Sequence, residues 1–154
     1  MPPTTRHPSH VHLARRATVG LGVALLALAV AAPVTTAAGA KTKLASVRSN
    51  GTHGNGGSEK ASISGNGRYV AFASDATNLV NNDTNGAWDI FVHDRKTGKT
   101  KRVSKRSNGT EGNDDSEDTS ISGDGRYVAF ASSATNLVKN DTNGVDDVFW
   151  RGPL

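Results

Sequence analysis

The chain has no cysteine and only eight aromatic residues, all of them after residue 60. Without cysteine there is no disulfide to hold the fold together. The structure must therefore depend on a hydrophobic core, on a metal or on neighbouring copies of a structural unit.

Acidic residues are missing from the first 40 positions, whereas Met1–Arg16 is basic and Val19–Ala32 is an uncharged apolar run. Ala38-Gly39-Ala40 places small residues just before Lys41. This layout is typical of a secretory signal peptide over residues 1–40. Cleavage after Ala31 is an alternative. A membrane anchor is another, although the run is short for a bilayer, which needs about 20 residues.

The positive charge belongs largely to this leader. All 14 acidic residues but only 15 of the 18 Lys and Arg residues follow residue 40, so the mature net charge is about +1 rather than +4. This balance gives no reason to expect nucleic-acid binding. We expect a secreted, extracytoplasmic protein that has no membrane contact after cleavage.

An internal repeat dominates residues 41–154. Ser62–Gly86 recurs as Ser120–Gly144, 58 residues later, and 34 of the 52 pairs between residues 45–96 and 103–154 are identical. Such self-similarity is the mark of a repeat architecture. The first repeat covers about residues 45–102 and the second about 103–154.

One repeat predicts four short strands, because β-branched and aromatic runs alternate with turn sequences rich in Gly, Asn and Asp. The expected strands are Lys60–Ser64, Tyr69–Ser74, Asp89–Asp94 and Thr100–Ser104. Tyr69, Ala71 and Ala73 should lie on one face of their strand, and Val70 and Phe72 on the other. No helical period appears after residue 40.

These units resemble the PD40 or WD40-like repeat of TolB-type β-propellers. The matching residues of the second copy are Ser122, Asp124, Gly125, Ala129 and Phe130; in the first copy Asn66 replaces the aspartate. The resemblance implies an all-β fold of two propeller-type blades, in a subgroup of secreted bacterial proteins. A β-solenoid and a two-repeat sandwich are the alternatives.

No catalytic motif is present, and we expect no enzymatic activity. His53 and His93 are not repeated and have no nucleophile motif beside them, so we interpret them as surface histidines.

The repeated sequence N-D-T-N-G-x-x-D brings oxygen-bearing side chains together twice. These are Asp83, Asn85 and Asp89, and again Asp141, Asn143 and Asp147. Oxygen ligands at alternate positions followed by a carboxylate suit Ca²⁺. No cofactor is required by the sequence. The alternative is an Asx-turn, in which the Asp and Asn side chains accept hydrogen bonds from nearby backbone N–H groups.

Two charged clusters lie side by side in the sequence. Basic residues gather around the fourth strand, and acidic residues follow between Glu111 and Asp118. They indicate a bipolar contact surface or a polyanion site. The simpler interpretation is that charges on an outermost strand prevent unwanted edge pairing.

We therefore predict a binding module whose partner is a protein or a cell-wall glycan. The alternatives are a calcium-stabilised surface module and the remnant of a propeller once attached to a hydrolase. The second repeat stops before its fourth strand, yet Thr42–Arg48 resembles that strand. Two blades are too few for a ring. We expect a truncated gene product, an open pair of blades, or a homo-oligomer of three or four copies that completes the propeller.

Overall fold

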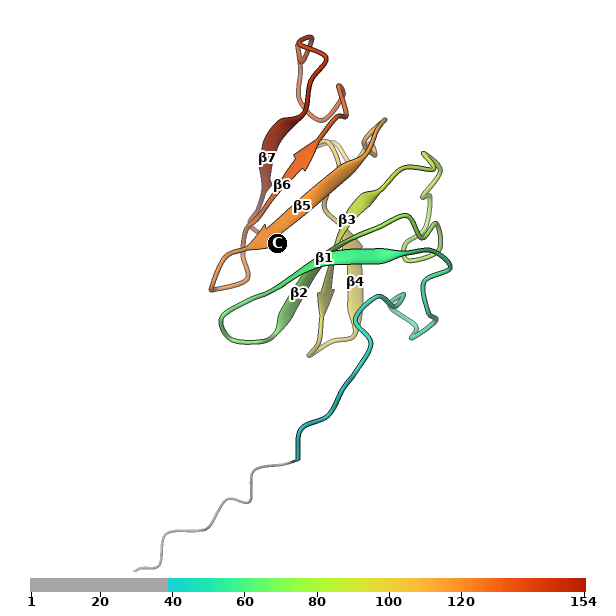
Figure 1. Ribbon diagram of the computed structural model, residues 1–154, viewed down its shortest axis with the longest axis vertical. Helices are drawn as coiled ribbons and strands as arrows, with labels where there is room; N and C mark the ends of the chain where they lie inside the picture. Colours follow the sequence, from blue (N-terminus) through green and yellow to red (C-terminus); the bar gives the residue numbers. More distant parts are fainter. Residues whose placement is uncertain (1–38) are drawn as a thin grey trace, which may run out of the picture. The chain divides into compact units, whose positions relative to one another are not determined.

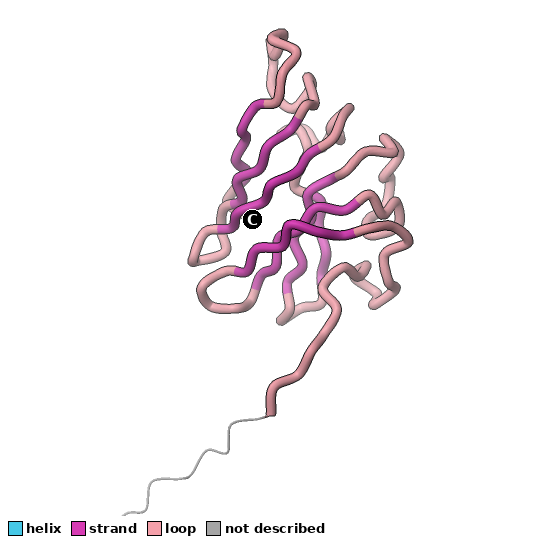
Figure 2. Tube along the Cα trace, in the orientation of Figure 1, coloured by secondary structure: helices cyan, strands magenta, loops and turns pink. Residues whose placement is uncertain are grey.

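The computed structural model describes residues 39–154. The signal peptide predicted over residues 1–40 falls almost entirely outside this range and stays a prediction. In the described part, every regular element is a β-strand (Figure 2). No helix in it is long and apolar enough to cross a membrane.

The first repeat forms a four-stranded antiparallel sheet in which neighbours in sequence are neighbours in space (Figure 1). Its strands are β1 (Ser58–Ile63), β2 (Tyr69–Ser74), β3 (Asp89–Asp94) and β4 (Lys99–Arg102). The predicted bounds of β2 and β3 are confirmed. β1 and β4 each begin and end one or two residues before the predicted bounds.

The second repeat forms a separate three-stranded antiparallel sheet in the order β5-β6-β7. Its strands are β5 (Ser116–Ile121), β6 (Val128–Ser132) and β7 (Asp147–Arg151). An all-β fold of two antiparallel sheets is thus established for the described part of the chain, and no closed barrel is formed. Within the described residues, β5 and β7 are the two edge strands of the second sheet.

The tight turn between the first two strands of each sheet depends on one glycine and one side-chain cap. Gly67 and Gly125 adopt positive φ angles of 67° and 74°, which glycine tolerates without strain. Asn66 and Asp124 each accept a hydrogen bond from the backbone N–H two residues later. Asparagine therefore replaces aspartate in this turn without changing its geometry.

Each sheet has two faces of different composition. We call the side bearing Tyr69, Ala71, Ala73, Ile90 and Val92 the alanine face of the first sheet, because the β2–β3 register pairs these residues. The opposite side, with Val70, Phe72 and Phe91, is its phenylalanine face. The predicted alternation along β2 is confirmed, since the two groups belong to separate hydrophobic clusters.

The main core lies between the two sheets. Ala71, Ala73, Ile90 and Val92 of the first sheet cluster with Val128 and other residues of the second. The second-sheet members are Ile121, Val128, Phe130, Ala134 and Leu137. The alanine face of the first sheet therefore packs against the phenylalanine face of the second, and β5 lies against β1 and β2.

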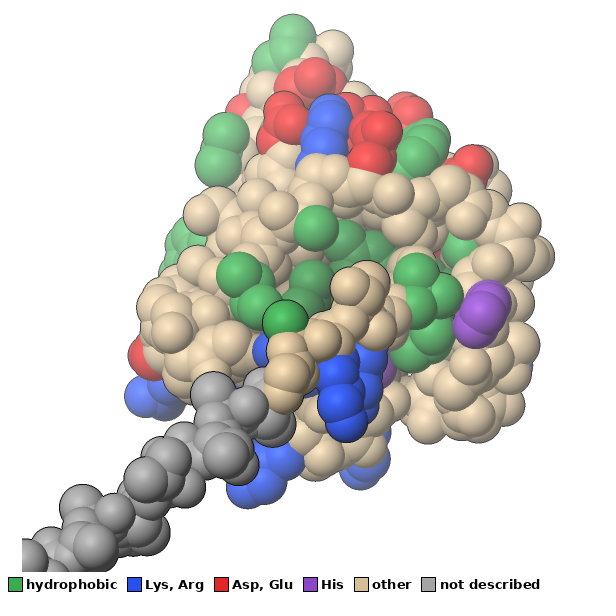
Figure 3. Space-filling model, turned by 60° about the horizontal axis from the view of Figure 1, so that its bottom comes forward, with side chains coloured by type: hydrophobic (Ala, Val, Ile, Leu, Met, Phe, Trp, Pro, Cys, Tyr) green, Lys and Arg blue, Asp and Glu red, His purple; other side chains and the backbone are tan. Residues whose placement is uncertain are grey.

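Charged residues also join the sheets at their surface. Lys60 pairs with Glu117 and lies 3.0 Å from the carboxylate of Asp118. Figure 3 shows acidic side chains grouped around a basic one at the top of the visible face, with further basic side chains at the bottom. The acidic cluster predicted from the sequence is thus partly used in contacts between the repeats.

Candidate functional site

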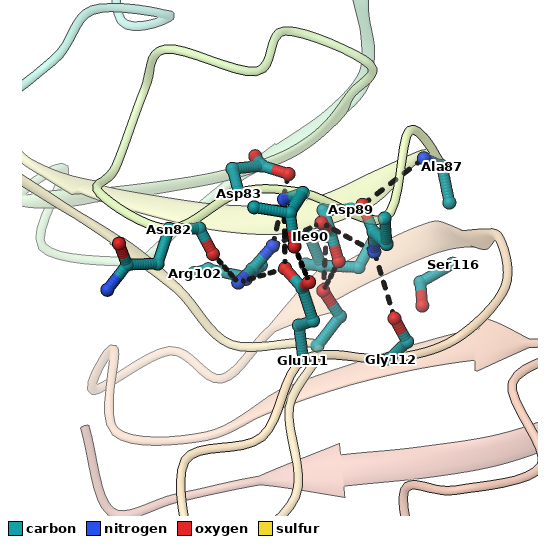
Figure 4. A network of polar contacts seen from close by, with 12 residues as sticks. Asn82, Asp83, Ala87, Asp89, Ile90, Arg102, Glu111, Gly112 and Ser116 are labelled. Atoms are coloured by element: carbon teal, nitrogen blue, oxygen red, sulfur yellow. Dashed lines mark hydrogen bonds and ion pairs between the residues drawn. The ribbon is translucent and has the colours of Figure 1, made fainter.

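The first N-D-T-N-G-x-x-D motif surrounds the guanidinium of Arg102 (Figure 4). Nη1 of Arg102 lies 2.8 Å from Oδ2 of Asp89 and 3.2 Å from Oδ1 of Asp83. Nη2 lies 2.8 Å from Oε2 of Glu111 and donates to the carbonyl oxygen of Asn82 at 3.0 Å. One buried cation therefore meets three carboxylates.

Strand alternation explains why Arg102 is buried. Along β4 the side chains of Lys99 and Lys101 are exposed, whereas those of Thr100 and Arg102 are buried. The register pairs Arg102 with Phe91, which places the guanidinium on the phenylalanine face beside the start of β3. The interpretation of this strand as a surface charge cluster is wrong for Arg102.

Asp89 is the most enclosed member of the cluster. Its carboxylate also accepts hydrogen bonds from Ser104 and from Asn85, the latter at 3.2 Å. Burial raises the pKa of Asp89, while Ser104 and Arg102 oppose that rise. Burial and the neighbouring charge of Asp89 likewise raise the pKa of Asp83.

Glu111 connects this cluster to the start of the second repeat. It accepts hydrogen bonds from the hydroxyl and the backbone N–H of Thr84. Burial alone would raise the pKa of Glu111, but these bonds and Arg102 lower it overall. Burial alone would lower the pKa of Arg102, but Asp89 and the other carboxylates raise it. The charged forms of Arg102 and Glu111 stabilise each other.

The structure brings Asp83, Asn85 and Asp89 together as the calcium hypothesis requires, but around a guanidinium. Between residues 39 and 154, no group of three or more His, Asp and Glu side chains has an arrangement that could hold a metal ion. The Asx-turn contact is confirmed: Asn85 accepts from the N–H of Ala87, and Asn143 from that of Val145, both at 3.2 Å.

The second motif has a more open environment. Asn143 donates to Oδ2 of Asp147 at 2.8 Å, as its counterpart does in the first motif. Within the described part of the chain, no Lys or Arg side chain forms an ion pair with Asp141 or Asp147. The second pair of carboxylates therefore lacks the cation that the first pair has.

An open groove of about 870 Å³ runs beside β7. Ser107, Asp141, Asn143, Asp147, Trp150 and Arg151 are among its lining residues. In the first sheet, β4 occupies the corresponding place beside β3. The groove is thus the place where a fourth strand of the second sheet would lie, and the second motif forms part of its wall.

The histidine hypothesis needs one correction. His53 is exposed as expected. His93, in contrast, is buried on β3, where Nδ1 lies 2.9 Å from the hydroxyl of Thr100. Burial lowers the pKa of His93, so the neutral imidazole is favoured. His93 is buried because β3 lies between β2 and β4, where His93 pairs with Val70 and with Thr100.

Sequence reasoning missed Arg102 and Glu111 as members of the site. The available signal was the period of two in Lys99–Arg102, which alternates Lys with Thr and then Lys with Arg. That period places Arg102 on the same side as Thr100. Nothing local to Glu111 indicates its contact with Thr84, because the two residues meet only through the packing of the repeats.

Fold and site together define a two-repeat, all-β protein with an open sheet edge bordered by an acidic motif. No protein-family model matches the chain, and no curated protein sequence is significantly similar to it. The resemblance to TolB-type propeller repeats is untested by these comparisons and stays a prediction.

Proposed function

We propose that this chain is an exported interaction module without catalytic activity, which binds an extended segment of a protein partner along β7. The observation that carries the proposal is the difference between the two repeats. β3 has β4 beside it, whereas β7 has an open groove in the same position. An edge strand with unpaired N–H and C=O groups is a template for strand addition.

Side chains beside the groove favour a protein partner over a glycan. Val148 and Trp150 on β7 are strongly exposed. Apolar and aromatic side chains of this kind are typical of the centre of a protein interface, so their exposure here indicates a surface that a partner covers. Asp141 and Asp147 add negative charge at one end of the groove. In the first repeat, Arg102 shows how a strand can bring a cation to this position.

We further propose that each sheet is a propeller-type blade. A four-stranded antiparallel sheet, with neighbours in sequence order and a face packed on the next sheet, is the arrangement found in blades.

Export rests on the leader sequence alone. N-terminal sequencing of the secreted protein should begin at Lys41, or near Ala32, and a full-length chain retained in the membrane would contradict export.

A peptide with the sequence of β4 tests the binding groove. Residues 98–106 as a synthetic peptide should bind the full chain in a calorimetric titration, because the peptide pairs with β7 as β4 pairs with β3. The Asp141→Asn/Asp147→Asn double variant should weaken this binding roughly tenfold, which corresponds to about 1.4 kcal/mol for a lost charge-assisted contact.

The matched control is a peptide in which methionine replaces the residue equivalent to Arg102. It should bind both proteins equally, since it has no guanidinium for the two carboxylates. A β4 peptide that does not bind, or that binds equally well to the double variant, would contradict the proposed use of the groove.

Calcium is a second candidate ligand, favoured by the absence of an ion-paired Lys or Arg at Asp141 and Asp147 among the described residues. If it binds, millimolar calcium raises the melting temperature by linkage. Asp141→Ala should abolish the rise, and Asp83→Ala should leave it, because Arg102 already neutralises the first motif. A melting temperature that does not respond to calcium leaves the second motif as an Asx-turn.

A further inference from the structure

Positions related by the repeat differ sharply in exposure on the alanine face. Ile90 is 0% exposed, whereas its counterpart Val148 is 81% exposed. Val92 is 6% exposed, whereas its counterpart Trp150 is 71% exposed. The first sheet buries this face against the second sheet, and the second sheet leaves the same face open.

The phenylalanine face shows the reverse difference. Ile63 of the first sheet is 56% exposed, whereas its counterpart Ile121 is 9% exposed. Val70 is half-buried, and its counterpart Val128 is fully buried. On the same face Phe72 and Phe91 are buried in a cluster with Ala76 and Leu79, so the open part of the phenylalanine face is the edge formed by Ile63 and Val70. This edge and the open alanine face correspond to the two halves of the interface that already joins the sheets.

We infer that a second copy of this chain docks on the open alanine face with the phenylalanine face of its own first sheet. The contact repeats the internal interface between the two sheets. The inference rests on the proposed function, because the same copy would supply Thr42–Ala45 as the strand beside β7. Large exposed apolar side chains on a sheet face mark a docking surface, and the repeat identifies its occupant.

Two of the polar contacts of the internal interface can form again between copies. Internally, the N–H of Ile121 donates to the hydroxyl of Ser62 at 3.3 Å. The repeat places Ser120 opposite Ile63 of the second copy, so both groups are present again. The internal pair of Lys60 with Asp118 becomes Asp118 with Lys60 of the second copy, with the two charges exchanged.

Close backbone approaches are also repeated. A Cβ atom at Gly65 would lie 3.1 Å from the carbonyl oxygen of Gly123, and a Cβ atom at Gly125 would overlap the ring of Tyr69. A Cβ atom at Gly123, in contrast, would have no neighbour within 4 Å. In the assembly, Gly123 would meet Gly65 of the second copy, which has the small residue that the approach requires.

Ser46 gives Thr42–Ser46 one of the side chains that contact the motif in the first sheet. In the first sheet, the hydroxyl of Ser104 donates to Asp89 and accepts from the N–H of Ile90 at 3.0 Å. Ser46 is the counterpart of Ser104, and it would meet Asp147 and the N–H of Val148. Residues 41–44 are exposed and have no regular secondary structure, so they are free to pair.

At the proposed contact between copies, the positions equivalent to Arg102 and Glu111 hold different residues. The counterpart of Arg102 is Leu44, and that of Glu111 is His53. The ion pair of Arg102 and Glu111 is thus replaced by an apolar residue and an imidazole. Thr42–Ser46 therefore matches the first sheet at Ser46 but brings no guanidinium to Asp141 and Asp147.

The two docking faces are different surfaces, so the contact is head to tail. Such a contact makes a closed ring if its rotation closes and an open chain if it does not. It also makes a specific genetic test available, because each face can be blocked separately at an exposed residue. A two-fold dimer, which uses one surface twice, would respond differently.

We would measure the mass in solution of protein expressed from the full 154-residue sequence by light scattering after size exclusion. The wild type should form oligomers. Val148→Lys blocks the alanine face, Ile63→Lys blocks the phenylalanine face, and each variant alone should be a monomer. An equimolar mixture should form dimers only, because one intact interface joins the two variants. Restored dimers also show that both variants are folded.

Thr135→Lys is the matched control, since it adds the same charge at an exposed loop position, and it should assemble as the wild type does. A monomeric wild type, or a mixture that stays monomeric, overturns the inference. Loss of assembly in Val148→Lys but not in Ile63→Lys indicates a two-fold dimer and also overturns it. Binding of the β4 peptide by such a monomer would leave the proposed function intact.

Discussion

Arg102 organises the polar end of the first sheet at the scale of single residues. It is 8% exposed and is the cation nearest to Asp83, Asp89 and Glu111. Burial of charge is costly, and a buried ion pair is stabilising only relative to the state in which one partner is missing. Replacing Arg102 alone should therefore destabilise the fold more than replacing Arg102 together with its carboxylate partners.

Arg102→Met tests this asymmetry. Methionine keeps an apolar chain of similar length, but Asp89 stays buried without its cation, so unfolding should become easier by about 3–5 kcal/mol. Lys101→Met is the control on the same strand, because the Lys101 side chain is exposed, and its effect should stay within about 0.5 kcal/mol. Urea unfolding gives the free energy of unfolding of both variants, and equal losses would contradict the role of Arg102 as the cation that the buried carboxylates require.

Asp94 gives the protein a predictable response to acid. Nε and Nη2 of Arg68 donate to its carboxylate at 3.0 and 2.7 Å, and these bonds lower the pKa of Asp94. An unfolded aspartate has a pKa of about 3.9. The stabilisation is therefore complete above that value and is lost as the pH falls through the lower folded-state pKa.

Asp94→Asn should reduce stability at neutral pH and make less difference as the pH falls below about 4, because the wild type then loses the same interaction. The raised pKa values of Asp83 and Asp89 act in the opposite sense, but they are common to both proteins and cancel in the comparison. The measurement is the difference in urea midpoint as a function of pH. A difference in urea midpoint that does not change with pH would contradict the stabilising ion pair between Arg68 and Asp94.

At the scale of elements, local sequence was sufficient for the central strands and insufficient for buried charge. Tyr69–Ser74 and Asp89–Asp94 were predicted with their observed bounds, because apolar β-branched and aromatic runs end at clear turn signals. The burial of His93 and Arg102 was missed. Their partners come from other strands and loops, and a pattern within one strand contains no information about which polar groups face it.

The candidate site shows the same limit. Both acidic motifs could be found from the repeat, and the Asx-turn within each was predictable from the order of Asn and Gly. The difference between them was not predictable from their residues, which are nearly identical. It arises because β4 covers the first motif and a groove lies beside the second.

Phe130 tests the packing between the elements. Its ring stacks on Phe149 with centroids 5.9 Å apart, and it belongs to the core shared by the two sheets. Phe130→Ala should cost about 3–5 kcal/mol, as large-to-small core substitutions do. Val148→Ala, on the exposed side of β7, should change stability by no more than about 0.5 kcal/mol in dilute solution. A loss below about 1 kcal/mol for Phe130→Ala would contradict the packing described here.

At the scale of residues 39–154 as a whole, the two sheets depend on each other. The hydrophobic cluster between them takes residues from both, and a three-stranded sheet with one uncovered face buries little apolar surface by itself. Trp88 adds a backbone connection. Its N–H donates to Asp115 at 2.7 Å, and its carbonyl oxygen accepts from the N–H of Ser116 at 2.7 Å.

We therefore expect both sheets to unfold in one cooperative transition. In a Trp150→Phe variant, Trp88 becomes the only tryptophan, and its partly buried ring packs against the shared core. Its fluorescence should change at the same urea concentration as the far-ultraviolet circular dichroism of the strands, because loss of the interface removes the support of both sheets. The protein concentration must be low, so that self-association adds no second step. Two separate transitions would mean that one sheet is stable without the other, and the core between them would then contribute less than its burial indicates.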